Sequence, residues 1–175
     1  ALSSEFNDAP ERASRPFDRL RDGFVMGEGA ATLVVESWAH AKKRKARVYA
    51  ELVGYAATSE AYHMVIPQED GQEIATTMKI GLDSAGIGPD QVDYINAHAT
   101  STTIGDAVET KAVRSLFKNR ADKIAISATK SLIGHTLGAA GAIGAVATTL
   151  SIHTGQIHPT ANYEEPDPAC RLDGI

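Results

Sequence analysis

The feature of this sequence that most constrains its fold is an ordered alternation of helix and strand patterns over residues 70–154. Three segments with apolar residues at helical spacing enclose two short apolar runs that are typical of buried strands. In chain order these segments are 70–86, 92–97, 106–116, 123–128 and 136–154. The order helix, strand, helix, strand, helix predicts an α/β layer architecture with parallel strands.

The first third of the chain carries shorter patterns. The apolar run 30–35 and the period-2 alternation over 47–55 predict two further strands, and residues 36–45 between them predict a short basic helix. Residues 1–22 are polar and broken by two prolines, which indicates a surface segment with turns.

Composition limits the classes of partner. The 175 residues are 43% hydrophobic and 22% charged, as in a soluble globular protein. Lys plus Arg is 17 against 22 for Asp plus Glu, so the net charge of -5 argues against nucleic acid or an anionic membrane as a partner. Residues 132–150 are mostly Gly, Ala, Thr and Ser, so we expect a helix packed inside a protein and not a membrane span.

The single cysteine, Cys170, cannot form an internal disulfide or a zinc site of several thiolates, which favours a reducing compartment. It lies in an acidic loop with only Arg171 as a neighbouring cation, so we interpret it as structural and not as a nucleophile. The sequence begins without Met or a secretory signal and ends just after a turn-like Asp-Gly. We therefore expect a piece of a longer chain.

The first candidate site residue is His98, which follows the predicted strand 92–97. Ligands of α/β sheets gather outside the carboxyl ends of the strands. An imidazole there can donate or accept a hydrogen bond near neutral pH, and the hydroxyls of Thr100, Ser101 and Thr102 could bind a polar ligand arm. The alternative is a histidine satisfied by the backbone, with the hydroxyl residues capping the next helix.

The second strand end carries Lys130, and His135 follows five residues later, just before a predicted helix. The helix dipole there disfavours the imidazolium form, so a neutral imidazole could donate to a developing oxyanion. In the alternative interpretation, Gly134 and His135 only form a turn and cap the next helix. Two lone histidines at two strand-to-helix junctions nevertheless suggest a shared site.

Two carboxylates, Asp106 and Glu109, form a capping pattern at the start of a predicted helix, although Glu109 could instead face Lys130. Gly-rich phosphate-binding motifs are absent from the sequence. Ser127 and Lys130 match a serine-lysine acylation motif only superficially, since that spacing works on a helix. His98 and His135 lack metal-ligand spacing, so no metal site is expected.

Several motifs, taken in order, resemble the β-ketoacyl-acyl carrier protein synthases of the elongating, type II kind, which are condensing enzymes of the thiolase superfamily. The resemblance covers essentially the whole chain and is specific as an ordered set. The motifs are residues 21–29, 61–64, 96–102, Gly105-Asp-x-x-Glu109, 127–130, Gly134-His135 and 137–141.

The resemblance implies a thiolase-like fold with two similar α/β halves. Residues 1–57 would then be the end of the first half, and 58–175 most of the second. Members of the family condense an acyl group, held on a cysteine, with malonyl-acyl carrier protein and release carbon dioxide. The resemblance therefore implies an acyltransferase of fatty acid elongation that needs no cofactor beyond the phosphopantetheine of its carrier.

Individual roles carry over by matching motif. His98 and His135 correspond to the histidines that hold the malonyl thioester carbonyl during decarboxylation. Lys130 matches the lysine beside them and Glu109 its acidic partner, with Asp106 in support. In the same way, Thr100 and Thr102 correspond to the threonines that hydrogen-bond the pantetheine arm.

The resemblance also implies what lies outside the chain. The family's nucleophilic cysteine would precede residue 1, and closing strands would follow residue 175. Smaller departures are Val65, Ala99 and Thr103, where the family often has Thr, Gly and Pro. Val65 puts one polar contact in doubt. The implied partners are acyl carrier protein, acyl and malonyl thioesters and a second copy of the parent, in the cytoplasm or in a mitochondrion or plastid.

Two other functions stay open. A non-catalytic subunit, either chain-length-factor-like or carrier-binding, would not need both histidines and Lys130, whose presence argues against it. A thiolase-type enzyme that uses coenzyme A is a weaker alternative.

Overall fold

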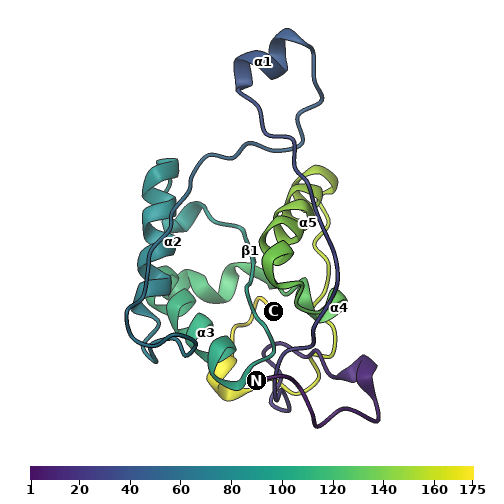
Figure 1. Cartoon of the computed structure of the whole chain (residues 1–175). Coiled ribbons are helices and arrows are strands. Elements are labelled where there is room, and N and C mark those ends of the chain that lie inside the picture. The colour runs from purple at the N-terminus through teal and green to yellow at the C-terminus, as the bar shows by residue number, and fades with distance from the viewer.

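The computed structural model describes all 175 residues, with helices on two sides of a small parallel sheet (Figure 1). The α-helices are α1 (Trp38–Lys43), α2 (Gln72–Ala85), α3 (Thr103–Phe117), α4 (Lys130–Ile133) and α5 (Ala140–Thr154). The strands are β1 (Tyr94–Asn96) and β2 (Ala125–Ser127). Short 3-10 helices cover Pro10–Arg12, Pro89–Gln91, Lys118–Lys123, Leu137–Ala139 and Pro168–Cys170.

The sheet has the predicted parallel pairing. Tyr94 pairs with Ala125 and Asn96 with Ser127, so both strands end at the same edge. Helix α3 makes the crossover between them, and it packs against α2 on one side of β1 while α5 lies on the other side (Figure 1). The α/β architecture with parallel strands is therefore confirmed, and the edge that carries the strand ends faces the predicted site.

The core lies between the sheet and α3. Ile124 and Ile126 from the β2 region pack against Val113 and Phe117 of α3. Side chains from both ends of the chain complete the same cluster: Phe17, Cys170 and Leu172 are all buried in it. The two terminal segments are thus part of the core that supports the sheet.

Helix α3 begins at Thr103, three residues before the predicted start. Asp106 and Glu109 consequently lie within the helix, and their carboxylates accept hydrogen bonds from backbone N–H groups of other segments, including that of Phe17. The interpretation of this pair as a cap that opens the helix is wrong. Asp106 instead joins the helix to the N-terminal segment, and Glu109 joins it to the end of the preceding strand.

The two strands predicted at 30–35 and 47–55 are absent, although α1 lies between them as expected. Both segments run as long connections to α1, which projects from the rest of the chain (Figure 1). Their apolar side chains are exposed, with Val34 at 84% and Leu52 at 78%. A strand needs a neighbour for its backbone hydrogen bonds, and these segments have none in this chain.

The segment predicted as a helix over 136–154 consists of a 3-10 turn followed by α5. By length and apolar composition alone, Leu137–Thr154 could cross a membrane, and core helices of soluble proteins meet the same criterion. Most of its residues are half-buried or exposed. Within this chain, therefore, neighbouring segments cover α5 only in part, which falls short of the expected helix packed inside a protein.

Candidate active site

The rings of His98 and His135 meet beyond the ends of the two strands. Their centroids are 5.6 Å apart and their planes are inclined at 87°. His98 follows β1, and His135 follows the short helix α4 that continues from β2. The structure thus brings together the two histidines that the sequence places at separate junctions.

A close approach of two backbone segments fixes His135. Its N–H donates to the carbonyl of Val25 at 2.7 Å, and its carbonyl accepts from Gly27 at 3.0 Å. A side chain at Gly27 would meet the carbonyl oxygen of Ile133 at 2.2 Å, and Gly134 has a φ of +73°. Glycine is therefore required at both positions for this contact.

The two rings line a cavity of about 390 Å³ together with Lys130. The opposite wall comes from the first turns of α5, where Ala140, Gly141 and Gly144 add almost no side-chain bulk. The run of small residues noted in the sequence thus leaves room beside the histidines for part of a substrate.

A backbone hydrogen bond indicates the tautomer of His135. Its Nδ1 accepts from the N–H of Leu137 at 3.1 Å, so a neutral ring carries its proton on Nε2. Burial lowers the pKa of His135, and the charge of Lys130 and the ring of His98 lower it further. The side chain is therefore a neutral N–H donor near pH 7.

The backbone of His98 is held from the adjacent helix. Both carboxylate oxygens of Glu109 accept at 2.7 Å, one from the N–H of His98 and one from that of Ala99. Solvent reaches the ring through the cavity, but surrounding protein atoms desolvate it and, with the charge of Lys130, lower the pKa of His98. This imidazole is also neutral near pH 7.

Lys130 is the charged group beside both rings, and only 8% of it is exposed. Burial lowers the pKa of its amine, while the charges of Glu109 and Asp106 act in the opposite direction. Burial raises the pKa of Glu109 despite its backbone hydrogen bonds and the charge of Lys130. The positive charge of Lys130 thus keeps the imidazoles neutral, and the negative charge of Glu109 in turn favours the protonated form of Lys130.

Four of the predicted site residues lie outside the cavity wall: Thr100, Thr102, Asp106 and Glu109. The hydroxyls of Thr100 and Thr102 hydrogen-bond each other at 3.1 Å, and Asp106 is fully buried behind the loop. Burial raises the pKa of Asp106 to about 7, and its Oδ1 has no hydrogen-bond partner. A role of the two threonines in binding a pantetheine arm stays a prediction.

Family models match nearly all of the chain. Residues 49–164 match the beta-ketoacyl synthase C-terminal domain, and residues 1–41 match the N-terminal domain of the same family. The chain belongs to the beta-ketoacyl synthase family.

Known members of the family are similar over the whole chain but are longer. The 3-oxoacyl-[acyl-carrier-protein] synthase 2 of Coxiella burnetii is 51% identical over all of the chain and 42% of its own length. The mitochondrial 3-oxoacyl-[acyl-carrier-protein] synthase of Arabidopsis thaliana is 49% identical over 96% of the chain and 37% of its own length. The chain therefore spans about two fifths of these relatives.

Solved ketosynthases have the same fold. A ketosynthase bound to a hexaketide, in complex with its type II polyketide synthase acyl-carrier protein, matches with a TM-score of 0.96 and 44% identity over 99% of the chain and 42% of that protein. A beta-ketoacyl synthase from Burkholderia phymatum matches with a TM-score of 0.93 and 43% identity over 99% of the chain and 42% of that protein. The prediction of a thiolase-like α/β fold is confirmed.

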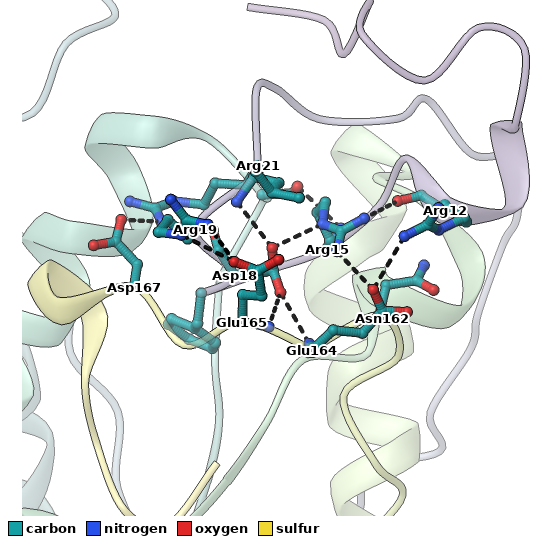
Figure 2. Close-up of polar contacts among 12 residues, drawn as sticks. Arg12, Arg15, Asp18, Arg19, Arg21, Asn162, Glu164, Glu165 and Asp167 are labelled. Carbon is teal, nitrogen blue, oxygen red and sulfur yellow. Dashed lines mark hydrogen bonds and ion pairs between the residues drawn. The ribbon is translucent and has the colours of Figure 1, made fainter.

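In this beta-ketoacyl synthase chain, the N-terminal segment holds the loop that follows His98. Arg21 donates to the carbonyl of Thr102 at 3.1 Å and to that of Thr103 at 2.8 Å. Its guanidinium also pairs with Asp167 at 2.6 Å (Figure 2). The N–H of Arg15 donates to the hydroxyl of Ser101. Segments near both ends of the chain thus fix the loop.

A buried ion pair holds these two terminal segments together. Arg15 and Asp18 have no exposed side-chain surface, and their charged groups lie 2.9 Å apart. The other carboxylate oxygen of Asp18 accepts from the N–H groups of Glu164 and Glu165 (Figure 2). Sequence reasoning missed this cluster because its partners are far apart in the chain.

Sequence reasoning also gave no separate role to two polar residues of the beta-ketoacyl synthase cavity wall, Asn96 and Thr129. Asn96 Nδ2 donates to Thr129 Oγ1 at 2.9 Å and so joins the ends of β1 and β2. Their positions offered a signal, since Asn96 lies two residues before His98 and Thr129 directly precedes Lys130.

Cys170 lies in the core of the beta-ketoacyl synthase chain and has no exposed surface. Burial raises the pKa of its thiol to about 11. A buried thiol that resists ionisation is a poor nucleophile, which agrees with its interpretation as a structural residue.

Proposed function

We propose that this chain is part of a 3-oxoacyl-[acyl-carrier-protein] synthase II, an acyltransferase of fatty acid elongation. It would condense an acyl thioester with malonyl-acyl carrier protein in a decarboxylative Claisen reaction. The observation that supports this most is the meeting of two neutral imidazoles, His98 and His135, in one cavity beside Lys130.

Decarboxylation of a malonyl thioester breaks the bond to the carboxylate and leaves its electron pair in an enolate. Negative charge therefore develops on the thioester oxygen. Neutral N–H donors stabilise that charge more strongly in the transition state than in the ground state, which lowers the barrier. The Nε2–H of His135 is such a donor, because its Nδ1 is occupied by the N–H of Leu137.

The supporting residues follow from their contacts. Lys130 would keep both imidazoles neutral, and Glu109 would hold the backbone that carries His98. Asp106 would fix the N-terminal segment through its bond to Phe17. The enolate carbon then attacks an acyl thioester on a cysteine and releases the thiolate. Cys170 is buried in the core and does not supply that thiol.

The substrates would arrive on an acyl carrier protein, whose phosphopantetheine is the only organic group required. A similar ketosynthase is known in complex with its acyl-carrier protein, which supports this partner. We further propose a homodimer of the full-length synthase. Relatives named as mitochondrial and chloroplastic support either organelle as an alternative to the cytoplasm.

A non-catalytic role is the second candidate. A ketosynthase/chain length factor matches the chain with a TM-score of 0.87 and 40% identity over 92% of the chain. A subunit without a decarboxylation to perform has no chemical need for two converged imidazoles and a buried lysine. The geometry of the cavity therefore favours the condensing enzyme.

Release of carbon dioxide from malonyl-acyl carrier protein by the full-length synthase separates these candidates. With an acyl-acyl carrier protein as co-substrate, we expect equal amounts of carbon dioxide and 3-oxoacyl product. Binding of the carrier without release of carbon dioxide would instead identify a non-catalytic subunit and refute the proposed reaction.

A further inference from the structure

The turn that carries Lys130 is attached to a segment outside the catalytic groups. After α5 the chain comes back along β2, and we call residues 158–161 the return segment. The N–H of Ala128 donates to Thr160 Oγ1 at 3.1 Å. The N–H of Ala161 donates to Ser131 Oγ at 2.8 Å. The return segment therefore contacts the turn on both sides of Lys130.

The third contact of the return segment is made by His158. Its Nε2 lies 3.0 Å from Thr129 Oγ1, and Thr129 directly precedes Lys130. Its Nδ1 lies 3.0 Å from the carbonyl oxygen of Pro159. A carbonyl can only accept, so Nδ1 donates to it. In the tautomer with its proton on Nδ1, Nε2 accepts from a hydroxyl, and that of Thr129 is closer than that of Ser127 at 3.4 Å. Both nitrogens of the ring are thus engaged.

The hydrogen bonds continue from Thr129 to the other strand. Asn96 Nδ2 donates to Thr129 Oγ1 at 2.9 Å and to the carbonyl of Gly144 in α5 at 3.3 Å. Asn96 lies two residues before His98. A single chain of side-chain contacts therefore runs from the return segment through Thr129 to the strand end that carries the first catalytic candidate.

Thr129 and Lys130 are buried, so loss of the histidine ring would leave a hydroxyl with one partner fewer in the cavity wall. A small displacement of a charged group beside the reacting centre costs rate even when substrate binding is kept. We propose that His158 is a positioning residue that acts through Thr129 to hold Lys130 and, through Asn96, the end of β1. This inference rests on the proposed condensing function.

The test compares His158→Ala with His158→Gln in the full-length synthase. The amide oxygen of Gln can accept from Thr129 where Nε2 does, whereas Ala cannot. We expect His158→Ala to lower kcat for malonyl decarboxylation about tenfold with KM changed less than about twofold, and His158→Gln to restore most of the rate. His153→Ala is the matched control, because this histidine contacts Arg47 and Tyr49 away from the cavity.

A double-mutant cycle identifies Thr129 as the intermediary. Thr129→Val removes the hydroxyl but keeps the shape of the side chain. If His158 acts through that hydroxyl, the double variant with His158→Ala should be no slower than the slower single variant. Independent, multiplying losses would overturn the inference. So would a kcat within twofold of wild type for His158→Ala, or equal losses for Ala and Gln.

A readout without turnover separates this inference from the proposed function. In ¹⁵N-lysine-labelled synthase, the NMR titration of Lys130 should differ between wild type and His158→Ala and should be unchanged in His153→Ala. If the synthase releases no carbon dioxide, the proposed function fails and this titration decides the inference alone. Identical titration of Lys130 in wild type and His158→Ala would then overturn it.

Discussion

The ring of His98 lies edge to face against that of His135, with centroids 5.6 Å apart. At this distance a proton on one ring opposes a proton on the other, and the ring of His98 lowers the pKa of His135. The charge of Lys130 in the same cavity also opposes protonation of either ring. The arrangement therefore favours two neutral N–H donors near pH 7.

Removal of either imidazole should abolish most of the decarboxylation. In the full-length synthase we expect His98→Ala and His135→Ala each to lower kcat about 10²- to 10³-fold, because each removes one donor to the developing oxyanion. Release of carbon dioxide from malonyl-acyl carrier protein measures the effect. His40→Ala is the control, since this exposed histidine of α1 pairs with Glu36. A near-normal rate in either cavity variant would refute the assignment.

The pH dependence should reflect the lowered pKa values of both histidines. The neutral rings are the donors, so the rate should rise with pH through these pKa values, and the midpoint of this acid limb should lie below the ordinary histidine pKa of 6.5. Lys130→Met removes a charge that lowers both pKa values and should move the acid limb to higher pH. A pH-rate profile checks the limb, and NMR titration of both rings checks its origin. An acid limb at the same pH in Lys130→Met and in wild type would contradict the role given to Lys130.

The convergence of the histidines could be predicted from the sequence because parallel strands end at the same edge of a sheet. A helical pattern between two short apolar runs was enough to place His98 and His135 at that edge. The parallel register of Tyr94 with Ala125 confirms the pairing on which this depends. The division of the chain into residues 1–57 and 58–175 stays a prediction.

The contacts that support the site could not be predicted in the same way. Asp106 binds the N–H of Phe17, and no local pattern links these two residues. His158 is a lone histidine before a proline, without a repeat or a motif around it. The strands expected at 30–35 and 47–55 do not form for a similar reason. Periodicity indicates that a segment has an apolar face, but it does not show that a neighbouring strand is present to pair with it.

The thiol of Cys170 should be unreactive in the folded protein. With the pKa raised to about 11 by burial, little thiolate is present at pH 8. We expect iodoacetamide to label this residue about 100-fold more slowly in the native protein than after unfolding. Mass spectrometry of the peptide that contains Cys170 distinguishes it from other thiols of the full-length synthase. Rapid native labelling would contradict its structural role.

The stability of the folded state should depend on pH through Asp106. Burial raises the pKa of this carboxyl from its ordinary 3.8 to about 7, so the folded state holds a proton that the unfolded state releases. The stabilisation is present below about pH 4 and is lost as the pH rises to 7, at about 1.4 kcal/mol per pH unit. Asp106→Asn cannot bind or release this proton, so it should remove this part of the pH dependence of the free energy of unfolding, measured by denaturant unfolding at several pH values. An unchanged slope would refute the assignment.

Loss of one partner of the buried pair in Figure 2 should destabilise the protein more than loss of an exposed pair. Asp18→Asn removes the buried partner of Arg15 and leaves only the half-exposed Glu164 at 3.3 Å, so it should lower the free energy of unfolding by about 3 kcal/mol. Arg19→Gln breaks the exposed pair with Glu165, where solvent screens the charges, and should have little effect. Denaturant unfolding of both variants measures the difference. Equal effects would show that burial of Arg15 and Asp18 does not govern the attachment of the N-terminal segment.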